Sequence, residues 1–332
     1  MVVRLGPLPP GPIRRILFVT ATRIGDAVLS TGLLAHLLAR YPEARVTIVA
    51  GPAAAPLFTA VPRLERLIAL TKRSRSRHWL DLYAQVATSH WDLVVDLRGS
   101  ALSWLLWTRH RRVIAKGDPA EHRVEQLAHL FDLTPPPAPH LWVSAADEAV
   151  ADRLVPTGPT PILAIGPSAN WGAKQWRTER FIELALRLTA PGALFADARV
   201  AIFAAPHERA IVAPVLAALP PERRIDLIDA GALSVVAACL KRCRMFIGND
   251  TGLMHMAAAV GTPTLGLFGP SPVTQYGPWG SHTAAVLTPI SYAALVGDPS
   301  FDHRRQDTLM DSLTVEAAAA GALALAARTA RD

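Results

Sequence analysis

Apolar and polar positions alternate along the chain in two rhythms, one typical of strands and one typical of helices. A first β-branched run at residues 15–20 is followed by apolar residues at helical spacing over residues 25–39. Strands that alternate with helices predict parallel β-α-β units and a doubly wound α/β sheet. Four further strands are expected in the first half, at residues 45–50, 67–70, 91–96 and 112–115.

The second half repeats this order after a proline-rich break. Residues 133–139 and 156–161 are rich in Pro, Gly and Thr, which is typical of linkers. We therefore expect an N-terminal Rossmann-like domain of residues 1–155 and a C-terminal Rossmann-like domain of residues 156–332. The last helix, from near Thr314, is left free to pack back on the first domain. Because ligands bind at the carboxyl ends of parallel strands, we expect a site between the two domains.

Composition agrees with two domains in the cytoplasm. A single core stops growing at roughly 250–300 residues, and this chain has 332, of which 51% are hydrophobic. No apolar run reaches the ~20 residues of a membrane-spanning helix, and no signal peptide is evident. Cys239 and Cys243 lack the further ligands that zinc needs, so they are expected to be ordinary thiols.

Positive charge gathers in the first half. Residues 1–155 contain 19 Lys or Arg and 13 Asp or Glu, whereas residues 156–332 contain 15 and 14. Two runs, residues 72–79 and 104–112, interleave basic and aromatic side chains. Nucleic acid, phosphorylated lipid and a membrane surface all fit such an excess, and a solvated arginine-rich surface fits it as well.

The clearest candidate for chemistry follows the strand expected at residues 245–248. Asp250 or Thr251 can cap the next helix, which leaves backbone N–H groups near Gly252 free to bind an anion. His255 lies one turn further along that helix. The dinucleotide and P-loop glycine patterns are absent here, which disfavours both of those functions. A plain capped turn remains the alternative.

This stretch resembles the donor site of glycosyltransferase family 9, the ADP-heptose:lipopolysaccharide heptosyltransferases. Three more segments resemble the family in order and spacing. They are Thr22-Arg-Ile-Gly-Asp26-Ala-Val-Leu-Ser-Thr, Trp91-Asp-Leu-Val-Val-Asp-Leu-Arg-Gly99 and Gly166-Pro-Ser-Ala-Asn-Trp-Gly-Ala-Lys174-Gln-Trp176. The resemblance implies a GT-B fold and an inverting transfer without an obligate metal or cofactor.

The resemblance also implies roles for single residues. Asp26 is the expected general base, at a helix N-terminus that keeps a carboxylate ionised, although capping that helix is its plainer role. Lys174 is the expected cation on the donor diphosphate, with a solvated lysine as the alternative. Ser168 and Asn170 are expected to add hydrogen bonds, although the family often has Thr in this stretch.

Three further residues are expected to contact substrates. Glu208 resembles the acidic residue that binds the nucleoside ribose, with stabilisation of its helix as the alternative. The family more often has Gly-Gly before this segment, and this chain has Ala204-Ala205, which puts the local backbone geometry in doubt. Arg23 and Arg98 are placed to meet an anionic acceptor.

The resemblance thus implies an inverting glycosyltransferase that moves a heptose or related sugar from a nucleotide-diphosphate donor, and it favours ADP-heptose. The expected acceptor is an anionic, lipid-linked lipopolysaccharide core or similar glycan. We expect a monomer, peripheral on the inner face of the inner membrane, that binds no nucleic acid. A non-catalytic nucleotide-sugar or anion binder on the same fold is the alternative, and the intact Asp26 argues against it.

Overall fold

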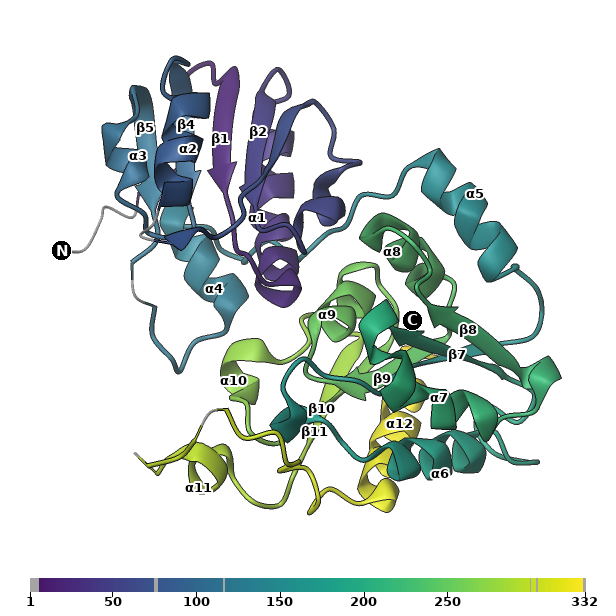
Figure 1. Ribbon diagram of the computed structural model, residues 1–332. Helices are drawn as coiled ribbons and strands as arrows, with labels where there is room; N and C mark the ends of the chain where they lie inside the picture. The colour runs from purple at the N-terminus through teal and green to yellow at the C-terminus, as the bar shows by residue number, and fades with distance from the viewer. Residues whose placement is uncertain (1–5, 75–76, 116, 299, 303, 331–332) are drawn as a thin grey trace. The chain divides into compact units, whose positions relative to one another are not determined.

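The structure is a computed structural model that describes residues 6–74, 77–115, 117–298, 300–302 and 304–330 (Figure 1). Its chain divides into two compact units, one up to Ser144 and one from Ala145 onward. The sequence places the boundary at residue 155 instead. The difference is α5 (Ala145–Leu154), which packs on α8 (Leu233–Lys241) of the second unit. Arg242, just after α8, holds α5 through ion pairs with Glu148 and Asp152.

The described residues of the first unit form a parallel five-stranded sheet in the order β3-β2-β1-β4-β5. Its strands are β1 (Arg15–Val19), β2 (Arg45–Ala50), β3 (Leu64–Ala69), β4 (Trp91–Asp96) and β5 (Thr108–Val113). Its helices are α1 (Ile24–Arg40), α2 (Arg77–Val86), α3 (Leu102–Leu105) and α4 (Arg123–Ala128), with 3-10 turns η1 (Ala55–Phe58) and η3 (His129–Phe131). Leu82 of α2 and Leu102 of α3 share one buried cluster with Leu17 and Val94 of the sheet, so both helices cover the same face.

Two strands of this sheet begin earlier than the sequence predicts. The third begins at Leu64 and the fifth at Thr108, instead of residues 67 and 112. Residues 108–112 of β5 are polar or charged, so they carry no apolar pattern to mark a strand. Such residues are tolerated because β5 is an edge strand, which among the described residues has β4 as its one neighbour.

The described residues of the second unit form a parallel six-stranded sheet in the order β11-β10-β9-β6-β7-β8. Its strands are β6 (Ile162–Gly166), β7 (Arg199–Ala204), β8 (Arg224–Ile228), β9 (Met245–Asn249), β10 (Thr264–Phe268) and β11 (Thr283–Leu287). Besides α5 and α8, its helices are α6 (Thr178–Leu188), α7 (Arg209–Ala217), α9 (Gly252–Ala259), α10 (Val273–Tyr276), α11 (Tyr292–Val296) and α12 (Val315–Thr329). Three 3-10 turns are η4 (Gly172–Lys174), η5 (Pro206–Glu208) and η6 (Pro221–Arg223).

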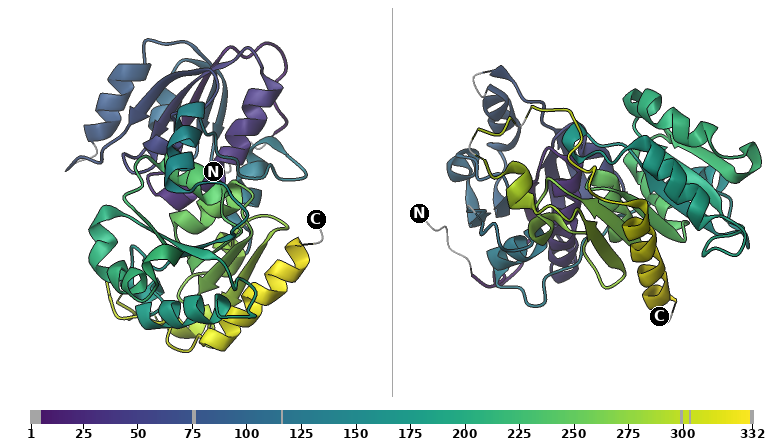
Figure 2. Two further views of the ribbon diagram at one scale, coloured as in Figure 1. Left: turned by 90° about the vertical axis from the view of Figure 1, so that its right-hand side faces the viewer. Right: turned by 90° about the horizontal axis from the view of Figure 1, so that it is seen from below.

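The last helix packs inside its own unit. Helix α12 contacts α6, β10 and β11, and its Ala318, Ala322 and Leu325 are buried in the core of the second unit. Figure 2 shows this helix, in yellow, beside the sheet of that unit. The sequence left open whether this helix packs back on the first domain. Its alanine face instead packs against the second unit, where small side chains allow close contact.

In each sheet the strand order changes side at one place, here called the reversal point, and this place locates the candidate site. The chain leaves β1 toward β2 and β3 and then returns beside β1 as β4. In the second sheet it leaves β6 toward β7 and β8 and returns beside β6 as β9. Gly166 and Gly248 face each other there, and a Cβ added at Gly248 would lie 2.8 Å from the Gly166 carbonyl oxygen. Loops that follow such strands line a crevice in which ligands bind.

Candidate active site

An ion pair lies at the reversal point of the second sheet. Lys174, in the turn after β6, places its Nζ 2.6 Å from Oδ2 of Asp250, just after β9. The Asp250 side chain is 6% exposed and that of Lys174 is 24% exposed, so solvent reaches the lysine more readily. The His255 Nε2 lies 3.8 Å from the other Asp250 oxygen. A buried carboxylate needs such partners. Lys174, the more exposed member of the pair, is the cation that an incoming anion could contact.

The N-terminus of α9 lies beside this pair. Thr251 is the N-cap residue, one of the two candidates in the sequence, and its side chain makes no capping hydrogen bond. Within the described chain, its buried Oγ1 has no hydrogen-bond partner. The first N–H groups of a helix, from Gly252 onward, have no partner within the helix. This end of α9 therefore presents donors and a positive dipole, as the sequence predicts for an anion site.

Asn249, the last residue of β9, connects this turn to the loop after β6. Its Nδ2 donates to the carbonyl oxygens of Pro167 at 3.0 Å and Ser168 at 3.3 Å. Its Oδ1 accepts from the backbone N–H of Trp176 at 3.1 Å. Sequence reasoning missed this role. The available signal was an amide side chain between a strand and an N-cap, where an Asn can satisfy backbone groups of a neighbouring loop.

Glu208 is held at the end of β7. Its Oε2 accepts from Ser168 Oγ at 2.9 Å and from the backbone N–H of Ala205 at 2.8 Å. Ala205 has a φ of −76°, which any residue adopts, so the alanines that replace the family's usual glycines fit this backbone without strain. Ser168 and Glu208 are thus brought together, while Asn170 is exposed in the same loop.

A second feature missed by the sequence analysis braces the Lys174 turn from outside. The backbone N–H of Gly172 donates to Gln306 Oε1 at 3.1 Å, and Leu309 N–H donates to the Ala173 carbonyl at 2.9 Å. Thr308 Oγ1 donates to the Gln175 carbonyl at 2.6 Å. A Cβ at position 172 would lie 2.1 Å from the Gln306 carbonyl oxygen, so this contact requires a glycine.

In the first unit, the candidate base Asp26 and the candidate acceptor-binding arginines lie at the reversal point of that unit's own sheet. Asp26 is half-buried in the first turn of α1, and the exposed Arg23 is the N-cap residue of that helix. The N-terminal dipole of a helix favours the ionised form of a carboxylate in its first turn. The structure thus places Arg23 and Asp26 within one turn of each other, at the N-terminus of the helix that follows β1.

Arg98 lies in the turn after β4. The buried Asp96 fixes this turn by accepting from the backbone N–H groups of Arg98 and Ser100, each at 2.9 Å. The Arg98 guanidinium lies 4.7 Å above the ring of Trp79. Burial lowers the pKa of Arg98, and the Asp96 carboxylate opposes that shift. Arg98 is therefore a pre-oriented cation at the same edge of the sheet as the N-terminus of α1, which carries Asp26.

Comparison with known proteins decides which family combines these features. The profile of "Glycosyltransferase family 9 (heptosyltransferase)" matches residues 80–299, more than half of the chain. The chain belongs to glycosyltransferase family 9. It is therefore a glycosyltransferase, as the resemblance of its motifs predicts, and its donor is a nucleotide sugar.

Relatives of this family 9 enzyme extend over most of its length. Lipopolysaccharide heptosyltransferase 2 of Salmonella typhimurium is 26% identical and aligns with 82% of this chain and 87% of its own. A family 9 glycosyltransferase of Veillonella parvula matches the fold with a TM-score of 0.78, at 19% identity, over 96% of this chain and 99% of that one. E. coli ADP-heptose LPS heptosyltransferase II follows with a TM-score of 0.72, at 21% identity, over 95% and 99%. The predicted GT-B fold, with two doubly wound domains, is confirmed.

The family 9 enzyme shows no obvious metal site or membrane span where its residues are described. No three His, Cys, Asp or Glu side chains of that part gather as metal ligands, and no helix there is long and apolar enough to cross a membrane. Cys239 and Cys243 are buried and free. Burial raises the pKa of the Cys239 thiol to about 11 and also raises that of Cys243, so both thiols stay protonated.

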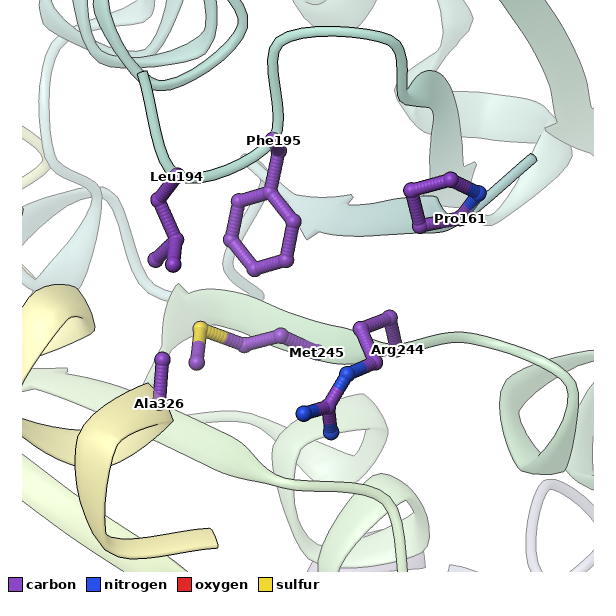
Figure 3. A pocket seen from close by; sticks show the side chains of 6 residues that line it. All are labelled: Pro161, Leu194, Phe195, Arg244, Met245 and Ala326. Atoms are coloured by element: carbon purple, nitrogen blue, oxygen red, sulfur yellow. The ribbon is translucent and has the colours of Figure 1, made fainter. Parts of the chain in front are cut away.

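A cavity elsewhere in the second unit is separate from the candidate site. It measures about 180 Å³ and lies at the amino ends of the strands, opposite the loops of Lys174 and Asp250. Its lining residues are Pro161, Leu194, Phe195, Arg244, Met245 and Ala326 (Figure 3). Because the chemistry of doubly wound sheets takes place at the carboxyl ends, we assign this cavity no part in transfer.

Proposed function

We propose that this enzyme transfers a heptose from ADP-heptose to a lipopolysaccharide core acceptor, with inversion at the anomeric carbon. The observation that carries the proposal is the ion pair of Lys174 and Asp250 beside the N-terminus of α9, which makes an anion site in a family 9 enzyme. The names of the Salmonella and E. coli relatives support the sugar, the nucleotide and the acceptor.

In the proposed reaction, one acceptor hydroxyl replaces the diphosphate at the anomeric carbon. Asp26 accepts the hydroxyl proton as the oxygen attacks, and the bond from the anomeric carbon to the diphosphate oxygen breaks with its electron pair on ADP. Lys174 and the N–H groups of α9 stabilise the negative charge that grows on the leaving diphosphate. Ser168, Asn170, Glu208 and His255 bind the donor. Arg23 and Arg98 bind the anionic acceptor.

The test is to incubate the purified enzyme with ADP-heptose and a deacylated core acceptor, and to follow ADP release and the glycan product. Transfer of heptose with inverted configuration is expected. Failure to release the nucleoside diphosphate from ADP-, UDP- and GDP-sugars alike, with donor binding intact, would favour the alternative of a non-catalytic nucleotide-sugar binder. The same assay in excess EDTA tests our proposal that no metal is obligate, because activity should persist.

We further propose that the enzyme works as a peripheral monomer on the cytoplasmic face of the inner membrane and binds no nucleic acid. The acceptor chemistry supports this location, since a lipid-linked core is presented at a bilayer surface. Sedimentation velocity tests the monomer. A filter-binding assay with duplex DNA and RNA tests the absence of nucleic-acid binding. An affinity that falls steeply as the salt concentration rises would contradict this proposal.

A further inference from the structure

Large apolar side chains are exposed in only one region of the first unit, as far as that unit is described. These residues all belong to α2, α3 and the turn between α3 and β5. They are Leu80 at 69% exposed, Tyr83 at 38%, Trp104 at 52%, Leu105 at 67% and Trp107 at 74%. Helices α2 and α3 cover the same face of the sheet, since Leu82 and Leu102 share one core cluster. Their outward sides therefore form one surface, here called the aromatic face.

The aromatic face is held rigidly at its edge by β5. Arg111 donates from Nε to the Ser103 carbonyl at 2.5 Å and from Nη2 to the Leu106 carbonyl at 3.1 Å. The same guanidinium lies 5.0 Å over the Trp104 ring. The ring of Trp107 packs edge-on against His90 at 5.3 Å. The exposed rings are thus fixed in place, although burying them inside the domain would be more favourable in water.

Positive charge surrounds this surface. Residues 72–112 contain eight Lys or Arg and three Asp or Glu, which accounts for most of the basic excess in the first half of the chain. Of the two basic runs, Arg75 and Ser76 lie outside the described residues. Arg77 is exposed one turn before Leu80, and Arg109 is exposed just after Trp107, with Asp92 3.8 Å away. Exposed tryptophan and leucine among basic side chains match the interface of an anionic bilayer.

We propose that the aromatic face is the surface through which this enzyme docks on an anionic phospholipid bilayer. Trp104, Leu105 and Trp107 insert into the interface, and Arg77 and Arg109 pair with lipid phosphates. This inference rests on the proposed function, which requires a lipid-linked acceptor, and it names the part of the enzyme that contacts the lipid.

The test is co-sedimentation of the full-length enzyme with phosphatidylcholine vesicles that do or do not contain phosphatidylglycerol. Leu105→Glu and Trp107→Ala should each lower partition onto the anionic vesicles about tenfold. Leu323→Glu is the matched control, because Leu323 is 52% exposed on α12 of the second unit, and it should bind like the wild type. Arg109→Gln should weaken binding only to anionic vesicles, whereas Arg304→Gln, at a side chain 93% exposed in the second unit, should not.

Equal binding by Leu105→Glu, Trp107→Ala and the wild type would overturn the proposal. It would also be overturned if the wild type sediments as a dimer that Leu105→Glu separates, because the surface would then join two copies of the chain. Transfer to a deacylated acceptor should be unchanged in Leu105→Glu. Wild-type enzyme that binds vesicles but transfers no heptose would refute the proposed function alone, and transfer without vesicle binding would refute only this inference.

Discussion

The two reversal points of this enzyme are built differently. In the second domain, side chains from three strand ends are joined to one another, since Lys174 pairs with Asp250 and Ser168 bonds to Glu208. In the first domain, Asp96 accepts hydrogen bonds from the turn that follows its own strand, while Arg23 is exposed. The donor loops are thus preorganised by contacts across the sheet, and the first domain offers charged groups from separate loops.

This difference fits the substrates that we propose. A nucleotide diphosphate is small and carries its charge in a fixed geometry, so donors and cations held in place bind it without further ordering. A core glycan on a lipid is larger and variable, and single charged side chains accommodate it more easily. Variants of the second domain should therefore impair donor binding, whereas loss of the base in the first domain should leave donor binding intact.

The largest effect is expected for Asp26→Asn. The asparagine amide cannot remove the proton from the acceptor hydroxyl. The kcat should therefore fall about 10²- to 10⁴-fold, while the Kd for ADP-heptose stays near the wild-type value. Single-turnover kinetics and calorimetry measure the two quantities. Glu43→Gln, at an exposed position after α1, is the control and should retain full activity. Turnover that survives in Asp26→Asn would remove Asp26 as the base.

Lys174→Met should come next, because it removes the cation and leaves Asp250 buried without its ion-pair partner. We expect kcat/KM to fall about 10²-fold, with part of the loss in donor affinity. Steady-state kinetics at varied ADP-heptose concentrations separate the change in kcat from the change in KM for the donor. Lys241→Met removes a lysine of the same domain, at the end of α8, that pairs with Glu148 of α5, and it should change kcat/KM little. Comparable losses in both variants would show that the effect of Lys174 comes from general destabilisation.

Asn249→Ala tests the connection between the two donor loops. The substitution leaves the backbone N–H of the buried Trp176 without its acceptor, so the free energy of unfolding should fall by about 2 kcal/mol. Misplacement of Lys174 should raise the KM for the donor more than it lowers kcat. Urea unfolding and steady-state kinetics measure these effects. Asn170→Ala, in the exposed part of the same loop, serves as the comparison, and an equal loss of stability there would contradict the role of Asn249.

The donor side was the more predictable one because its signals are local. A buried run, a strand end and an N-cap follow one another within residues 245–252, and each is recognisable from its neighbours. The ion pair of Lys174 with Asp250 was not predictable, since it joins residues 76 positions apart. The same holds for the brace at Gln306 and Thr308, which lies more than 130 positions from the turn that it supports.

Other errors have the same origin in long-range structure. The fifth strand lies at a sheet edge, where polar residues are tolerated. Its residues 108–112 therefore show a basic run in the sequence and no apolar pattern that would predict a strand. The assignment of α5 to the second unit depends on its packing against α8, which no linker signature shows. Charge alone left several partners open for residues 104–112. The exposure of Trp104 and Trp107 narrows that choice to our proposal of a bilayer.

The smallest expected effect concerns the link between α5 and α8. A hydrogen bond from Arg242 is the main cause that lowers the pKa of Glu148. A carboxyl whose pKa is lower in the folded state stabilises the fold above its unfolded pKa of about 4.3, and this contribution disappears as the pH falls through the folded value. Wild type should exceed Glu148→Gln in unfolding free energy by less than about 1 kcal/mol at pH 7, since the side chain is 32% exposed.

Urea unfolding at pH 7 and in stronger acid, below the folded pKa, measures whether this gap closes. Glu222→Gln, at an exposed position in η6, should show no gap that depends on pH. A constant gap for Glu148→Gln would mean that the carboxylate charge does not hold α5, and that packing against α8 alone assigns this helix to the donor domain. If the stability difference disappears in acid, the ion pair of Glu148 with Arg242 helps to hold α5 on the donor domain, in addition to packing against α8.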